Sequence, residues 1–163
     1  MLRNQDALDW ERIGTEARLA TDDVSAQGIG QRRLQVIVCP SFNESRAWEV
    51  RQFQSEWKLY RPRVVAPWPT VKLRGYDLVQ IDSLVLSSFF SRIVKLSVPI
   101  SPDLRGGGGC DGTVTQLAIF GDLLSECRFQ WWSQPPPKWK TLVEVASEMI
   151  AAFSAAEESQ RQP

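Results

Sequence analysis

The most suggestive run of residues for ligand chemistry is formed by four successive glycines, Gly106–Gly109. Backbone amides in such a run can cradle a phosphate group when a helix N-terminus follows. Here Cys110, Asp111 and Gly112 lead into a strand pattern, and the lysine and hydroxyl residues of a phosphate-binding loop are missing. The glycine run therefore favours a flexible connector over a phosphate site.

Three aspartates near this run, Asp103, Asp111 and Asp122, offer oxygen ligands for a divalent cation. Their spacing is wider than that of a calcium loop, and aspartate beside glycine is an ordinary turn former. Turn formation is the better interpretation of all three. We expect the protein to use no metal ion and no cofactor.

The chain contains no histidine. Histidine has the side-chain pKa nearest neutrality, so the usual general base and the commonest metal ligand are missing. Catalytic triads and histidine-based zinc sites are excluded within this chain. No carboxylate pair stands out by its spacing, and Lys95, Lys138 and Lys140 are interpreted as solvated side chains beside apolar ones. We predict that the protein is not an enzyme.

The composition is that of one globular domain, with 163 residues, of which 43% are hydrophobic. Basic and acidic residues number 19 each, and this balance argues against a dedicated nucleic-acid binder. Zero net charge does not oppose self-association, so a homodimer remains open. The three cysteines are widely spaced, and no segment resembles a signal peptide or a membrane span. We expect a cytoplasmic protein with reduced thiols and no membrane partner.

Hydrophobic periodicity predicts an α+β fold, a mostly antiparallel sheet of about five or six strands packed against one mid-chain helix and one C-terminal helix. A change of parity between Trp48 and Trp57 predicts a hairpin with its turn within 52–56. The proline-rich segment 61–69 is expected to be an irregular edge or a loop. Alternating apolar residues predict the other strands at 34–38, 76–81, 113–120 and 126–132.

Helical spacing predicts a mid-chain helix that begins after Asp82 or Ser83 and runs to about Leu96. A strand through Leu86 is the alternative, since serines and β-branched residues weaken the helix propensity. A second helix is predicted from about Pro137. The expected organisation is a weak N-terminal helix and polar linker over 1–31, a single α+β domain over 32–153 and a flexible tail over 154–163.

The aromatic residues give the most informative candidate surface. Strand parity assigns Trp131 to the core and Trp132 to the face that also carries charged residues. We favour a Trp132 covered by the chain's own N-terminal segment or its proline block; the alternative is an aromatic binding surface. Mixed aromatic and charged composition suits protein recognition. The candidate interaction surface comprises Trp132, Arg128, Glu126, Trp68 and Trp57.

Several short motifs resemble, in their order, those of an uncharacterised bacterial protein family. The resemblance covers roughly residues 34–153. It implies a small α+β domain, without catalytic residues to carry over. The motifs are Pro40-Ser41-Phe42, Val98-Pro99-Ile100, Asp111-Gly112-Thr113, Trp131-Trp132 and Pro136-Pro137 followed by Trp139.

Three hypotheses for function follow. The first is a non-enzymatic bacterial domain that binds another protein, by analogy an immunity partner of a toxin. The second is a small-molecule-binding protein or a histidine-free enzyme, with an acidic and aromatic cleft beside Trp57 and Trp68. The third is a structural or dimeric module.

Overall fold

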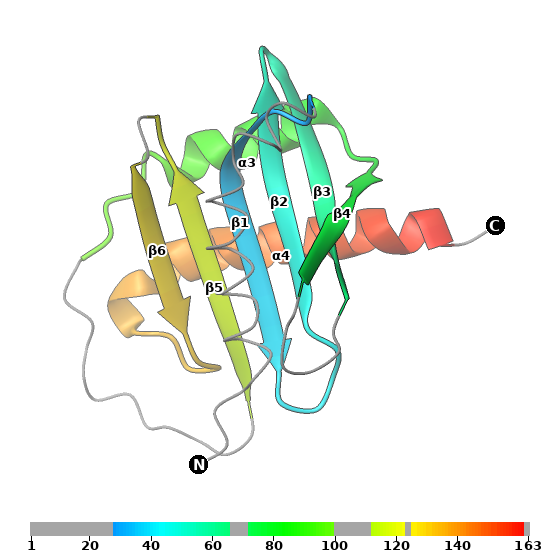
Figure 1. The fold of residues 1–163 in the computed structure, drawn as a ribbon. Coiled ribbons are helices and arrows are strands. Elements are labelled where there is room, and N and C mark those ends of the chain that lie inside the picture. Colours follow the sequence, from blue (N-terminus) through cyan, green and yellow to red (C-terminus); the bar gives the residue numbers. More distant parts are fainter. Residues whose placement is uncertain (1–27, 66–71, 100–111, 123–124, 162–163) are drawn as a thin grey trace.

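The computed structural model describes residues 28–65, 72–99, 112–122 and 125–161. Six strands form one antiparallel sheet with the spatial order β4-β3-β2-β1-β5-β6 (Figure 1). The predicted α+β fold, with one mid-chain helix and one C-terminal helix, is confirmed. The elements in chain order are β1 (Gln31–Pro40), β2 (Arg46–Phe53), β3 (Glu56–Val65), β4 (Lys72–Val79), α3 (Ser83–Ile93), β5 (Thr113–Phe120), β6 (Glu126–Trp131), the short 3-10 helix η1 (Pro137–Trp139) and α4 (Lys140–Arg161).

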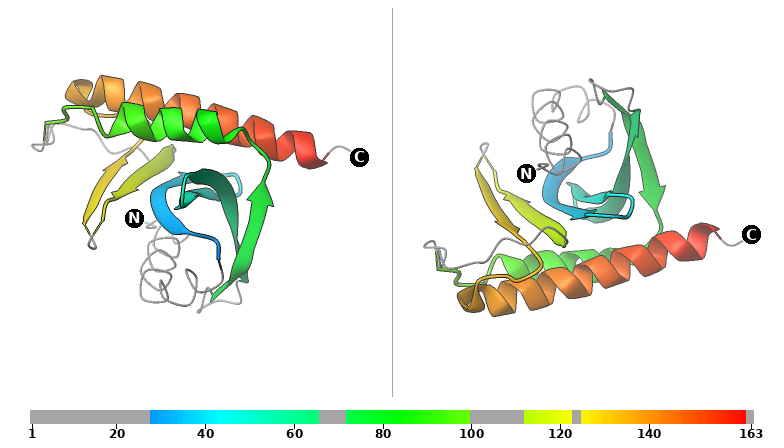
Figure 2. Two further views of the ribbon diagram at one scale, coloured as in Figure 1. Left: turned by 90° about the horizontal axis from the view of Figure 1, so that it is seen from above. Right: turned by 90° about the horizontal axis from the view of Figure 1, so that it is seen from below.

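The two helices cover one face of the sheet, where they lie side by side (Figure 2). Alternate residues of each strand point toward them, which produces the period-two pattern visible in the sequence. Trp131 belongs to this core, as its parity predicts. The core side chains from the strands are Leu34, Val36, Trp48, Val50, Leu59, Val79, Leu117 and Trp131, and those from α3 and α4 include Leu86, Phe89, Ile93, Leu142, Val145, Met149 and Phe153.

The predicted hairpin is formed by β2 and β3. Its register pairs Phe53 with Glu56, and the turn residue Gln54 has a φ of 56°. This left-handed conformation is uncommon outside glycine and fits a tight two-residue turn. The turn is where the apolar parity changes between the two strands.

We predicted an irregular edge or a loop over 61–69; residues 61–65 belong to β3, which continues through Val65 with a register shift between Arg63 and Val64. Pro62 is tolerated since the pairing of β2 with β3 ends at Glu49 and Tyr60. Beyond that point β3 pairs only with β4, so one side of the strand needs no amide donor. Residues 66–69, including Trp68, lie outside the described ranges.

The mid-chain helix α3 begins as predicted after Asp82, whose carboxylate accepts a hydrogen bond from the Leu84 amide at 2.8 Å. It ends at Ile93, earlier than predicted, and does not become a strand at Leu86. An Arg92–Glu148 ion pair of 2.6 Å links it to α4. The hydrogen bond from Arg92 holds the pKa of Glu148 below its usual range, so this pair stays charged to lower pH than an unpaired glutamate would.

The tail predicted over 154–163 to be flexible is helical as far as Arg161. The reason is Glu157, which is buried although it is charged. Its carboxylate accepts hydrogen bonds from Trp48 Nε1 at 3.2 Å and from Arg61 Nη1 at 2.6 Å, and it pairs with Arg161. These bonds anchor the last turns of α4 to β2 and β3.

Replacing Glu157 with alanine is expected to cost about 1–3 kcal/mol of stability, because Trp48 and Arg61 lose a buried charged acceptor. Amide hydrogen exchange should show the last turn of α4 opening more often. Glu158→Ala is the matched control, since Glu158 is exposed and lies 3.9 Å from Arg46. Equal effects of the two substitutions would contradict the anchoring role of Glu157.

Candidate functional site

The predicted interaction surface is only partly assembled. On β6, Arg128 donates two hydrogen bonds to the Glu126 carboxylate, at 2.6 and 3.0 Å. The indole of Trp132 is half-buried and packs against Gly112: a β-carbon on this glycine would lie 2.5 Å from Trp132 Nε1. The backbone just before β5 therefore covers part of this side chain, whereas residues 1–27 of the predicted N-terminal cover lie outside the described ranges.

The same corner joins three short sequence motifs. The Ser41 hydroxyl donates to the Gly112 carbonyl at 2.8 Å and accepts from the Gly112 amide at 3.0 Å. The Thr113 amide donates to Ser133 Oγ at 2.7 Å. These bonds tie the end of β1, the start of β5 and the residues after β6 together, which gives the motifs a structural role.

Trp57 does not belong to this surface. It lies on β3, three strands away from β5, and faces the helices, where its ring packs 5.0 Å from that of Phe90. Its backbone amide donates to Ser83 Oγ at 3.1 Å. Trp57 is therefore a packing residue between β3 and α3.

A charged cluster occupies the sheet face opposite the helices. The Glu49 carboxylate accepts from Arg51 at 2.7 and 3.0 Å and from Gln35 at 3.2 Å, and Arg32 lies 3.3 Å away. Arg51 also donates to the Tyr76 hydroxyl at 3.0 Å. Burial, reinforced by the negative charge of Glu49, raises the pKa of Tyr76. Since Glu49 and Arg51 are only 0% and 2% exposed, they form a structural network and are out of reach of a ligand.

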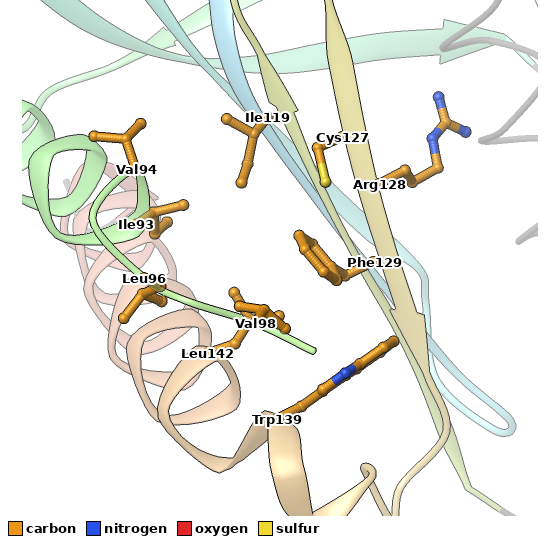
Figure 3. Close-up of a pocket in the computed structure, with 10 residues that line it drawn as sticks. All are labelled: Ile93, Val94, Leu96, Val98, Ile119, Cys127, Arg128, Phe129, Trp139 and Leu142. Carbon is orange, nitrogen blue, oxygen red and sulfur yellow. The ribbon is translucent and has the colours of Figure 1, made fainter. Parts of the chain in front are cut away.

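A cavity of about 440 Å³ lies between the end of α3, the start of α4 and the edge strand β6 (Figure 3). Its volume falls within the usual range for ligand pockets. Phe129 and Trp139 form one wall, with their rings edge to face at 5.5 Å. The lining residues are Ile93, Val94, Leu96, Val98, Ile119, Cys127, Arg128, Phe129, Trp139 and Leu142.

The chemistry of this cavity is almost wholly apolar. Cys127 and Phe129 extend into it from β6, whereas the Arg128 guanidinium points away toward the other face of the sheet (Figure 3). Trp139 Nε1 already donates to the Pro99 carbonyl at 3.1 Å. The exposed Cys127 thiol is therefore the one reactive group that the described lining presents. Such a wall favours a ligand with apolar groups.

The cavity does not bring together the carboxylates that acid-base or metal chemistry would need. None of its described lining residues is an aspartate or glutamate. Across the described ranges, no group of three or more cysteine, aspartate or glutamate residues is arranged to hold a metal ion. Asp122, one of the three aspartates considered above, pairs with Arg33 at 2.8 Å, and this bond lowers the pKa of Asp122. Asp103 and Asp111 lie outside the described residues.

Sequence reasoning missed the cavity, although it placed two of its walls correctly. The alternation along β6 assigns Cys127 and Phe129 to the core side, and helical spacing assigns Trp139 and Leu142 to the core. The empty volume depends on where α3 ends and on the path of the chain through Leu96 and Val98, which line the cavity together with residues of β6. No local pattern carries that information.

Comparison with known proteins gave no match to a family model, to a curated protein or to a solved structure. The resemblance to an uncharacterised bacterial family stays a prediction. Among the described helices, none is sufficiently long and apolar to cross a membrane.

Proposed function

We propose that this domain is a non-catalytic binding module that recognises another protein. It accepts an apolar side chain of the partner in the cavity beside β6. The observation that carries the proposal is that one wall of the cavity is the inward face of an edge strand. An immunity-like role in a bacterial cytoplasm is one form of this function.

The position of β6 suggests how the partner would bind. β6 is the last strand of the sheet among the described elements, and its only neighbour there is β5. An edge strand presents backbone donors and acceptors to an added strand. An extended segment paired with β6 would direct alternate side chains to the same face as Cys127 and Phe129. Backbone pairing would supply affinity, and the cavity would supply specificity.

A small apolar molecule is the second candidate occupant. The volume of about 440 Å³ and the aromatic wall formed by Phe129 and Trp139 support it. This candidate needs the cavity alone, whereas the first also uses the edge of β6. The two therefore differ in what blocks binding and in what competes for the site.

To test this proposal, short random peptides are first selected for binding to the full chain in which Cys110→Ser removes one of the three thiols. Cys127 of the same protein is then labelled with a bulky naphthyl maleimide. Cys127 is exposed and Cys39 is buried, so the label is directed to the cavity wall. We expect the label to lower the affinity of the selected peptides for the protein by about tenfold or more. In the matched control, Cys127→Ser with Ser88→Cys, the same label sits on an exposed residue of α3 and leaves binding unchanged.

Two outcomes would overturn protein recognition at this site. One is that every selected peptide binds the two labelled proteins equally. The other is that the Cys127 label prevents the binding of apolar dyes but does not affect the binding of any peptide. That result would support the small-molecule function instead. Thermal unfolding of each labelled protein verifies that the label has not disrupted the domain.

A further inference from the structure

The charged side chains around the cavity are unevenly paired. Lys95 stands between the lining residues Val94 and Leu96, and Lys138 directly precedes Trp139. Both lysines are exposed. Neither forms an ion pair with another described residue. These two cations therefore lie in the chain next to lining residues from two separate segments, the end of α3 and η1 just before α4.

The other cations of this region already have carboxylate partners. Arg92 pairs with Glu148 at 2.6 Å, and Arg128 pairs with Glu126 at 2.6 Å. Lys140 lies 3.9 Å from Glu144 on the same helix. In each of these pairs the two charges cancel, so among the described residues around the cavity Lys95 and Lys138 add a net positive charge.

We infer that the partner segment is acidic, with an apolar side chain for the cavity and aspartate or glutamate residues on either side of it. This inference rests on the proposed function and specifies its partner. A lysine side chain is long and flexible, and it keeps its ammonium in water while its stem covers apolar surface. Lys95 and Lys138 would meet the flanking carboxylates at the rim while the apolar group fills the centre.

Rim charges of this kind mainly set partner choice and association rate. Exposed ion pairs contribute little affinity each, but complementary potentials accelerate encounter and disfavour partners of like charge. Salt screens these interactions, because the Debye length is about 8 Å at physiological ionic strength. An acidic partner would therefore associate more slowly as salt is raised.

The experiment compares three synthetic peptides that share leucine at alternate positions and differ only in their flanks, which are glutamate, serine or lysine. We expect the unmodified chain to bind the glutamate peptide about tenfold more tightly than the lysine peptide at low salt. The double variant Lys95→Glu/Lys138→Glu should reverse this order. The control Arg46→Glu/Lys58→Glu changes the net charge equally, on β2 and β3, and should leave the order unchanged.

The outcomes separate this inference from the function on which it rests. If the serine peptide binds and the Cys127 label blocks it, but flank charge has no effect, the acidic partner is wrong and the binding module stands. If none of the three peptides binds, the peptide-recognition function fails as well. Should the double variant unfold, the salt dependence of the unmodified chain decides: no slowing of glutamate-peptide association with salt would overturn the inference.

Discussion

Replacing Glu49 with alanine is expected to destabilise the domain by about 3–5 kcal/mol. The carboxylate is fully buried and accepts two hydrogen bonds from Arg51, which is itself only 2% exposed. Removing it leaves the buried Arg51 guanidinium without the carboxylate that it donates to, and takes away the negative charge that lies 3.3 Å from Arg32. Urea denaturation followed by tryptophan fluorescence would measure the loss.

The sheet supplies its own matched control for this prediction. Glu126 and Arg128 on β6 repeat the Glu-x-Arg spacing of Glu49 and Arg51, with a similar distance of 2.6 Å, but their side chains are 15% and 27% exposed. Water compensates part of the lost pair there, so Glu126→Ala should cost about 1 kcal/mol or less. Equal losses at the two positions would show that burial does not amplify the effect of Glu49.

A double variant distinguishes a missing charge partner from a packing defect. Glu49→Leu/Arg51→Met removes both charges together and replaces them with apolar groups of comparable size. Because no unpaired charge remains on Arg51, its loss of stability should be smaller than that of Glu49→Ala alone. A larger loss would indicate that the shape of the pair, and not its charge balance, stabilises this face of the sheet.

The fold was predictable to the extent that its signals are local. Alternation along 113–120 and 126–131 defines β5 and β6, and the parity change between Trp48 and Trp57 locates the hairpin. Parity also separates Trp131 from its neighbour. Each of these inferences depends on residues a few positions apart, which strand geometry alone determines.

The errors arise where distant residues decide the outcome. The end of α4 was predicted to be a flexible tail because its sequence is polar, yet Glu157 is held by Trp48 and Arg61, which are 109 and 96 positions away. Trp57 was included in the candidate interaction surface, and its half-buried ring packs against Phe90 on α3. Long-range partners of this kind override local propensity. The cavity has the same origin, since its walls come from five separate elements, α3, β5, β6, η1 and α4.

Phe153→Ala is expected to cost about 3–5 kcal/mol, because truncating a large core side chain loses transfer free energy and leaves a cavity. Phe153 is completely buried, with its ring 6.1 Å from the rings of both Trp48 and Phe89. It therefore joins β2, α3 and α4 at one point, so its loss should lower the stability of the whole domain. Phe42→Ala is the matched control: this ring is 82% exposed, and its removal should change the free energy of unfolding by less than about 0.5 kcal/mol. If Phe153→Ala lowered the free energy of unfolding as little as Phe42→Ala, this would contradict a core in which Phe153 packs α4 against both β2 and α3.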